Sequence, residues 1–124
     1  MLQMANWTNV RLELGRTRDF PHGSPARHYL LRLPLGANNT IDEQVRADRP
    51  YLVTVRRFWP QEPDLRGHLV KVSQGWAFSY TLSEQDEEEF CQLPDHPLCL
   101  HETVTIAEAR DTNLPYRVSD LSAG

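Results

Sequence analysis

The stretch TVRRFWPQEPDLRGHL, residues 54–69, holds the side chains of this sequence that are best suited to chemistry. An arginine guanidinium can grip a carboxylate or phosphate through paired hydrogen bonds, and a histidine can exchange a proton near neutral pH. An aromatic ring can form one wall of a small-molecule pocket. We therefore select Arg57, Trp59, Arg66 and His68 as candidate ligand-binding residues.

Three consecutive strands are expected to position these side chains. Alternating apolar and polar residues predict strands over 51–58, 65–72 and 76–82. The connection SQG ends in glycine, as a tight hairpin with a left-handed residue would. Pairing Val72 with Trp76 across this hairpin then brings the large apolar residues of the last two strands onto one face.

The same register, continued to the first of these strands, predicts which charged residues lie together. It sets Arg57 opposite Arg66 and places His68 on the same face, at one end of an apolar core. Arg56 points to the opposite face, because side chains alternate along a strand. Two arginines directly opposite one another repel, so this register calls for an anion between them.

Two sources of negative charge are compatible with that arrangement. The protein's own carboxylates could neutralise the arginines, which is the simpler interpretation, or a bound anion could do so. The acidic residues concerned lie in the loop after the first strand and in a run after the third: Glu62, Asp64, Glu84, Asp86, Glu87, Glu88 and Glu89.

A second cluster has residue types that bind zinc, namely Cys91, His96, Cys99 and His101. Their spacing matches no standard finger or ribbon, and neither a CxxC nor an HxxxH pair occurs. We therefore predict no metal and no cofactor, and keep these four residues as weak candidates only.

The remaining elements indicate an all-β, mainly antiparallel fold in a single domain spanning residues 1–124. Seven or eight short strands, with prolines and glycines between them, predict a small closed or partly open β-barrel or rolled sheet. A two-sheet β-sandwich is the alternative. One short helix is expected near 41–48, where Thr40 and Glu43 have the spacing of a capping box and Pro50 follows.

Composition limits the classes of function. A formal charge of -4 argues against a nucleic-acid binder, and the absence of a long apolar run or an apolar leader indicates a soluble, cytoplasmic protein without a membrane partner. We expect a non-enzymatic binding or regulatory module for an anionic small molecule or an acidic protein segment. The alternatives are a small enzyme using His68 with Arg57 and Arg66, and an assembly protein that pairs through an exposed strand edge. The sequence does not decide between monomer and homodimer.

Overall fold

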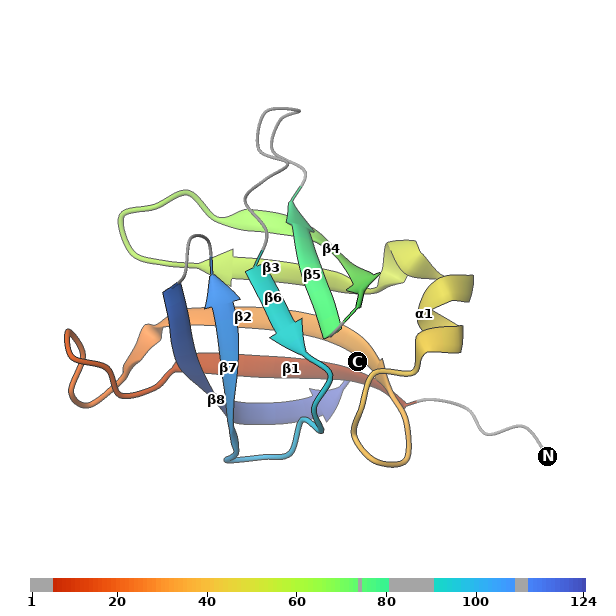
Figure 1. The fold of residues 1–124 in the computed structure, drawn as a ribbon, viewed down its shortest axis with the longest axis horizontal. Helices are drawn as coiled ribbons and strands as arrows, with labels where there is room; N and C mark the ends of the chain where they lie inside the picture. Colours follow the sequence, from red (N-terminus) through yellow and green to blue (C-terminus); the bar gives the residue numbers. More distant parts are fainter. Residues whose placement is uncertain (1–5, 74, 81–90, 109–111) are drawn as a thin grey trace.

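The computed structural model describes residues 6–73, 75–80, 91–108 and 112–124 of the chain. Eight strands, one short helix and one 3-10 turn make up this part (Figure 1). In chain order they are β1 (Asn6–Leu14), β2 (Ser24–Leu35), α1 (Glu43–Asp48), the 3-10 turn η1 (Pro50–Leu52), β3 (Thr54–Phe58), β4 (Leu65–Val72), β5 (Gly75–Tyr80), β6 (Cys91–Pro94), β7 (Thr103–Glu108) and β8 (Thr112–Ala123).

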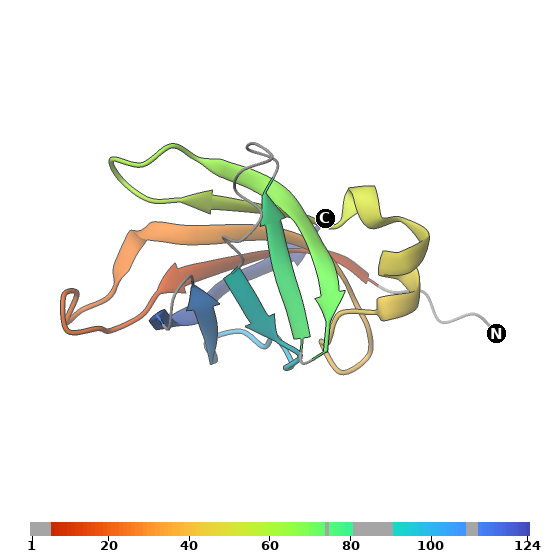
Figure 2. The same cartoon turned by 45° about the horizontal axis from the view of Figure 1, so that its top comes forward.

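The strands form a closed antiparallel barrel in which each strand pairs with its neighbours in the sequence. The barrel closes where β1 pairs with β8, along a register that runs from Thr8 opposite Ala123 to Leu14 opposite Tyr116. Figure 2 shows the sheet curling around to this closure. The predicted all-β barrel is confirmed, and the sandwich alternative is wrong, because one continuous sheet supplies all the described strands.

Alternation along the strands fills the barrel with apolar side chains. In β1, Val10, Leu12 and Leu14 are buried while Arg11 and Glu13 face outward, as the sequence predicts. An eight-stranded barrel has an interior about wide enough for side chains to fill. The largest fully buried residues are Trp76, Tyr29, Tyr116, Phe78, Leu12, Leu31, Leu33, Leu69, Leu93, Leu98 and Ile106.

The long β2–β3 connection covers one end of the barrel with α1 and η1 (Figure 1). The helix begins at Glu43, two residues later than predicted, because Asp42 rather than Thr40 is the N-cap and its carboxylate accepts a hydrogen bond from the Val45 N–H at 3.1 Å. Residues 51–52, predicted to begin a strand, belong to η1 instead, since proline at its first position fixes a helical φ and lacks an N–H.

The β6–β7 connection is tied to the same end of the barrel. The segment LCLH, residues 98–101, is not a strand although its apolar residues alternate: Leu98 is buried in the core, and its N–H donates to the Asn39 carbonyl at 2.8 Å. The side-chain amide of Asn39 in turn donates a hydrogen bond to the Leu98 carbonyl at 3.0 Å. Within the described residues, no helix has the length and apolar character needed to cross a membrane.

Candidate functional site

The structure places the four predicted site residues on two sides of the sheet. Arg57 pairs with Leu65 and faces the barrel interior, whereas Arg66 pairs with Arg56 and His68 pairs with Thr54 on the outer face. The prediction that Arg57, Arg66 and His68 share one face is therefore wrong. The prediction that Arg56 and Arg57 point to opposite faces is confirmed.

The β4–β5 turn explains the error. Val72 pairs with Gly75, so the turn has two residues instead of three, and Lys71 rather than Val72 lies opposite Trp76. A slip of one residue exchanges the two faces of a strand. Leu69 is accordingly buried, whereas Val70 lies on the outer face and is 38% exposed. Residues 81–82, predicted to end the third strand, lie outside the described residues.

Two glycines allow this register. Gly75 has a φ of +148°, and a Cβ there would collide with the Leu93 carbonyl oxygen of β6. Gly67 is an inward position of β4, where a Cβ would overlap the Ser79 carbonyl of β5. Glycine inside a strand commonly marks such a close backbone approach. The inner face of β4 therefore runs through Leu65, Gly67 and Leu69, with no side chain at its centre.

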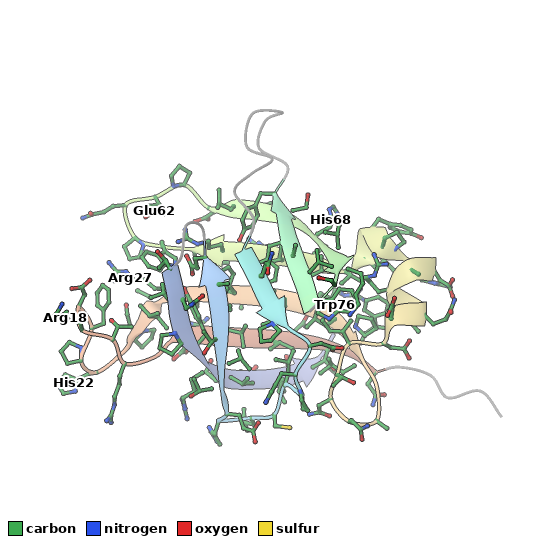
Figure 3. All side chains as sticks on the ribbon, in the orientation of Figure 1. Arg18, His22, Arg27, Glu62, His68 and Trp76 are labelled. Carbon is green, nitrogen blue, oxygen red and sulfur yellow. The ribbon has the colours of Figure 1, made fainter. Side chains whose placement is uncertain are left out.

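Arg57 is part of a polar cluster inside the end of the barrel away from α1. Its guanidinium forms ion pairs with Glu62 at 2.9 Å and with Glu108 at 3.3 Å. The other Glu108 oxygen accepts hydrogen bonds from the Tyr29 hydroxyl at 2.9 Å and the Tyr116 hydroxyl at 2.6 Å. Figure 3 shows Glu62 on the β3–β4 loop at this end, with His68 nearer α1. The simpler interpretation, that the protein's own carboxylates neutralise Arg57, fits these contacts.

Burial and charge shift the pKa values inside this cluster. Burial alone would lower the pKa of Arg57, but the neighbouring Tyr29 hydroxyl, Glu62 and Glu108 raise it overall. Burial also raises the pKa of Tyr116, and the adjacent Glu108 carboxylate raises it further. Trp59 lies over the same group, with its ring 4.5 Å from the Arg57 guanidinium carbon. The cluster is therefore a charged, hydrogen-bonded closure of the barrel interior.

A groove of about 480 Å³ lies on the outer face of β8, β1, β2 and β3. Cross-strand pairing gives it a row of residues that runs Asp120, Arg11, Leu30, Arg56, with Arg66 of β4 as the next position. Its lining has three arginines and one carboxylate. The lining residues are Asn9, Val10, Arg11, Leu30, Leu31, Arg32, Thr54, Arg56, Asp120 and Ser122.

The three groove arginines differ in their partners. Arg11 forms an ion pair with Glu13 at 2.8 Å, and Arg32 donates to the Leu52 carbonyl at 3.3 Å. Arg56 is exposed and rests over the Phe58 ring, 5.0 Å from its centre. Within the described part of the chain, no carboxylate lies within ion-pair distance of it. Arg56 is therefore the groove cation best able to accept an added anion.

The positive charge of this face also acts on a histidine. His28 pairs with Phe58 across β2 and β3, and the two rings stack with centroids 4.9 Å apart. Burial lowers the pKa of His28, and the charge of Arg11 lowers it further. His28 is therefore neutral at pH 7, and an anion bound nearby would raise its pKa.

The weak zinc candidates do not form a cluster among the residues that the structure describes. His96 faces the Pro97 carbonyl at 2.8 Å, and His101 lies 2.6 Å from the Arg117 guanidinium. The Cys99 thiol is free. The side chain of Cys91 and residues 84–89 lie outside the described part.

Sequence reasoning missed Glu108, Tyr29 and Tyr116 because only the closed barrel brings β2, β7 and β8 together. The groove arginines could have been found: Arg11 and Arg32 occupy the polar face of strands that alternation predicts well. The chain matches no protein-family model, no curated protein and no solved structure.

Proposed function

We propose that this protein is a non-enzymatic binding module that holds an anion in the outer groove. Arg56 is the principal binding residue, and Arg11 and Arg32 lie beside it in the lining. Arg66 and His68 extend the site onto β4. The observation that carries the proposal is the exposed Arg56 guanidinium, which has no described carboxylate within ion-pair distance. Such a guanidinium can form paired hydrogen bonds with the oxygens of an added anion.

The size of the groove supports a small ligand. Pockets for small molecules usually enclose roughly 300–1,000 Å³, and this groove has about 480 Å³. Leu30, at the centre of the row, supplies an apolar floor between Arg11 and Arg56. The ligand is therefore an anion with some apolar surface.

The alternatives have less support. The enzyme hypothesis requires Arg57 and His68 to act on one substrate, yet the sheet separates them. Assembly through a strand edge loses its basis because the described sheet closes on itself. We place the protein in the cytoplasm as part of this proposal, in keeping with a chain that has two cysteines and a free Cys99 thiol.

Titration calorimetry with pyrophosphate at low salt tests the proposal. We expect saturable binding that weakens by roughly tenfold or more in Arg56→Gln, because a hydrogen bond to a charged group contributes about 1.5–3 kcal/mol. Arg18→Gln is the matched control, since Arg18 is an exposed arginine on the β1–β2 loop, away from the groove (Figure 3). Equal binding by both variants, or no saturable binding by the unmodified protein, would overturn the proposal.

A further inference from the structure

Two arginines of the outer groove lie over aromatic rings on the same face of the sheet. The Arg32 guanidinium carbon is 4.4 Å from the centre of the Trp7 ring, and that of Arg56 is 5.0 Å from the centre of the Phe58 ring. The His28 ring stacks on Phe58 with an interplanar angle of 23°. The anion site is thus built on flat groups as well as on charge.

A guanidinium supported by a ring can bind in two directions. Its N–H groups point outward in the guanidinium plane, where they match the oxygens of a phosphate. Its faces can stack on a planar ring, as arginine does with unpaired bases. A lysine would offer a point charge without the flat surface. The two arginines that lie over rings therefore favour a ligand that carries both a phosphate and a planar ring.

The register gives the spacing between these groups. Arg56 pairs with Leu30 and Arg32 pairs with Thr54, so the two arginines are diagonal neighbours on adjacent strands. Such neighbours lie roughly 7–8 Å apart. Arg11 is two strands away from Arg56, at roughly 10 Å for a strand spacing near 4.8 Å. A phosphate held by one arginine and a ring stacked near the next fit within these distances.

We infer that the ligand of the groove contains a nucleotide unit, a phosphate joined to a planar heteroaromatic base. This inference rests on the proposed anion-binding function and specifies its ligand. The phosphate binds Arg56 with support from Arg11, and the base stacks beside Arg32 and Trp7. A free nucleotide and a single-stranded nucleic acid present the same unit, and both have the charge that the three arginines call for.

The chain's net charge of -4 does not oppose this site, because the groove lining itself has three arginines and one carboxylate. Screening limits the influence of distant exposed charges to about 8–10 Å near physiological salt. The local charge therefore decides binding in the groove.

Calorimetry with AMP, ribose 5-phosphate and adenosine separates the phosphate from the base. We expect AMP to bind roughly tenfold or more tightly than ribose 5-phosphate, because stacking on a protein surface contributes that much per base. Adenosine is expected to bind more weakly than AMP. In Trp7→Leu the advantage of AMP over ribose 5-phosphate should shrink severalfold, while ribose 5-phosphate binds as before.

Arg32→Gln, which removes the guanidinium beside the base, provides a second variant with the same expected loss in case Trp7→Leu fails to fold, and circular dichroism checks both. Equal affinity for AMP and ribose 5-phosphate, with both dependent on Arg56, would overturn this inference and leave the proposed function standing. Failure of every phosphate compound to bind would overturn both. An eight-residue oligouridylate that binds more tightly than UMP, with strong salt dependence, would support the inference with a single strand as the source, whereas equal binding would support it with the free nucleotide.

Discussion

Replacing Glu108 with alanine tests whether the polar cluster inside the barrel stabilises the fold. The carboxylate accepts hydrogen bonds from Tyr29 and Tyr116 and forms an ion pair with Arg57. Its side chain and that of Arg57 are each only 11% exposed, and both tyrosines are fully buried. The variant therefore removes the acceptor of both hydroxyl hydrogen bonds and one ion-pair partner of Arg57.

The expected loss follows from those contacts. An unsatisfied buried polar group costs about 1–3 kcal/mol, and breaking a buried ion pair by removing one partner costs about 3–5 kcal/mol. The two effects overlap, and Arg57 keeps its ion pair with Glu62, whose side chain is 50% exposed. We therefore expect the free energy of unfolding to fall by about 3–5 kcal/mol in Glu108→Ala. Glu108→Gln keeps an acceptor oxygen and the volume, so it should lose roughly half as much.

Urea unfolding at pH 7, followed by tryptophan fluorescence and circular dichroism, measures these losses. For a chain of this length each kcal/mol lowers Tm by about 3–5 °C, so Glu108→Ala should melt on the order of 10–20 °C below the unmodified protein. Glu102→Ala is the control, because Glu102 is an exposed carboxylate just before β7. It should unfold as the unmodified protein does.

Two results would refute the reasoning about this cluster. A loss below about 1 kcal/mol in Glu108→Ala would mean that the hydroxyls and Arg57 find other partners at little cost. A double-mutant cycle with Arg57→Met gives the pair's coupling energy directly. A coupling below about 0.5 kcal/mol would show that the ion pair does not contribute to stability.

Two further predictions concern β2 and β4. The pKa of His28 is lowered by burial and by Arg11, so as the pH falls the unfolded chain takes up a proton at His28 at a higher pH than the folded chain does. The contribution of neutral His28 to the free energy of unfolding is therefore complete above pH 6.5 and is lost as the pH drops through the folded pKa. Urea midpoints between pH 7.5 and 5 should decline more steeply in the unmodified protein than in His28→Gln, and parallel curves would contradict this. Gly67→Ala should cost roughly 3 kcal/mol or more, because its Cβ would overlap the β5 backbone at Ser79. Gly36→Ala, whose nearest neighbour would be 3.7 Å away, is the control, and equal urea midpoints for the two variants would rule out the overlap.

The sequence predicts most of the architecture because a strand that is buried on one face alternates apolar and polar residues along its length. Val10, Leu12 and Leu14 can be assigned to the core from β1 alone. The location of the helix also follows from local rules, although the cap moved from Thr40 to Asp42, since both residue types can accept the same hydrogen bond.

The register of β4 could not be predicted, because the strand LRGHLVKV has apolar residues on both faces. Leu65 and Leu69 point inward, while Val70 and Val72 occupy the other face, and either set could form a core. A turn shorter by one residue and the close approach of β5 at Gly67 decide between them. The turn length and this close approach both depend on backbone positions, which the pattern of apolar and polar residues does not indicate.

The two arginines Arg56 and Arg57 show which features of a site are local and which depend on the tertiary structure. By itself, the sequence determines that Arg56 and Arg57 lie on opposite faces, because alternation is a local property of the strand. Only the tertiary structure decides their partners. Barrel closure brings Glu108 to Arg57 across 51 residues of sequence, and pairing of four strands gathers Arg11, Arg32 and Arg56 around one groove. The basic, aromatic stretch thus divides into an internal ion pair of Arg57 and an exposed Arg56 in the outer groove, because the two side chains lie on opposite faces of the sheet.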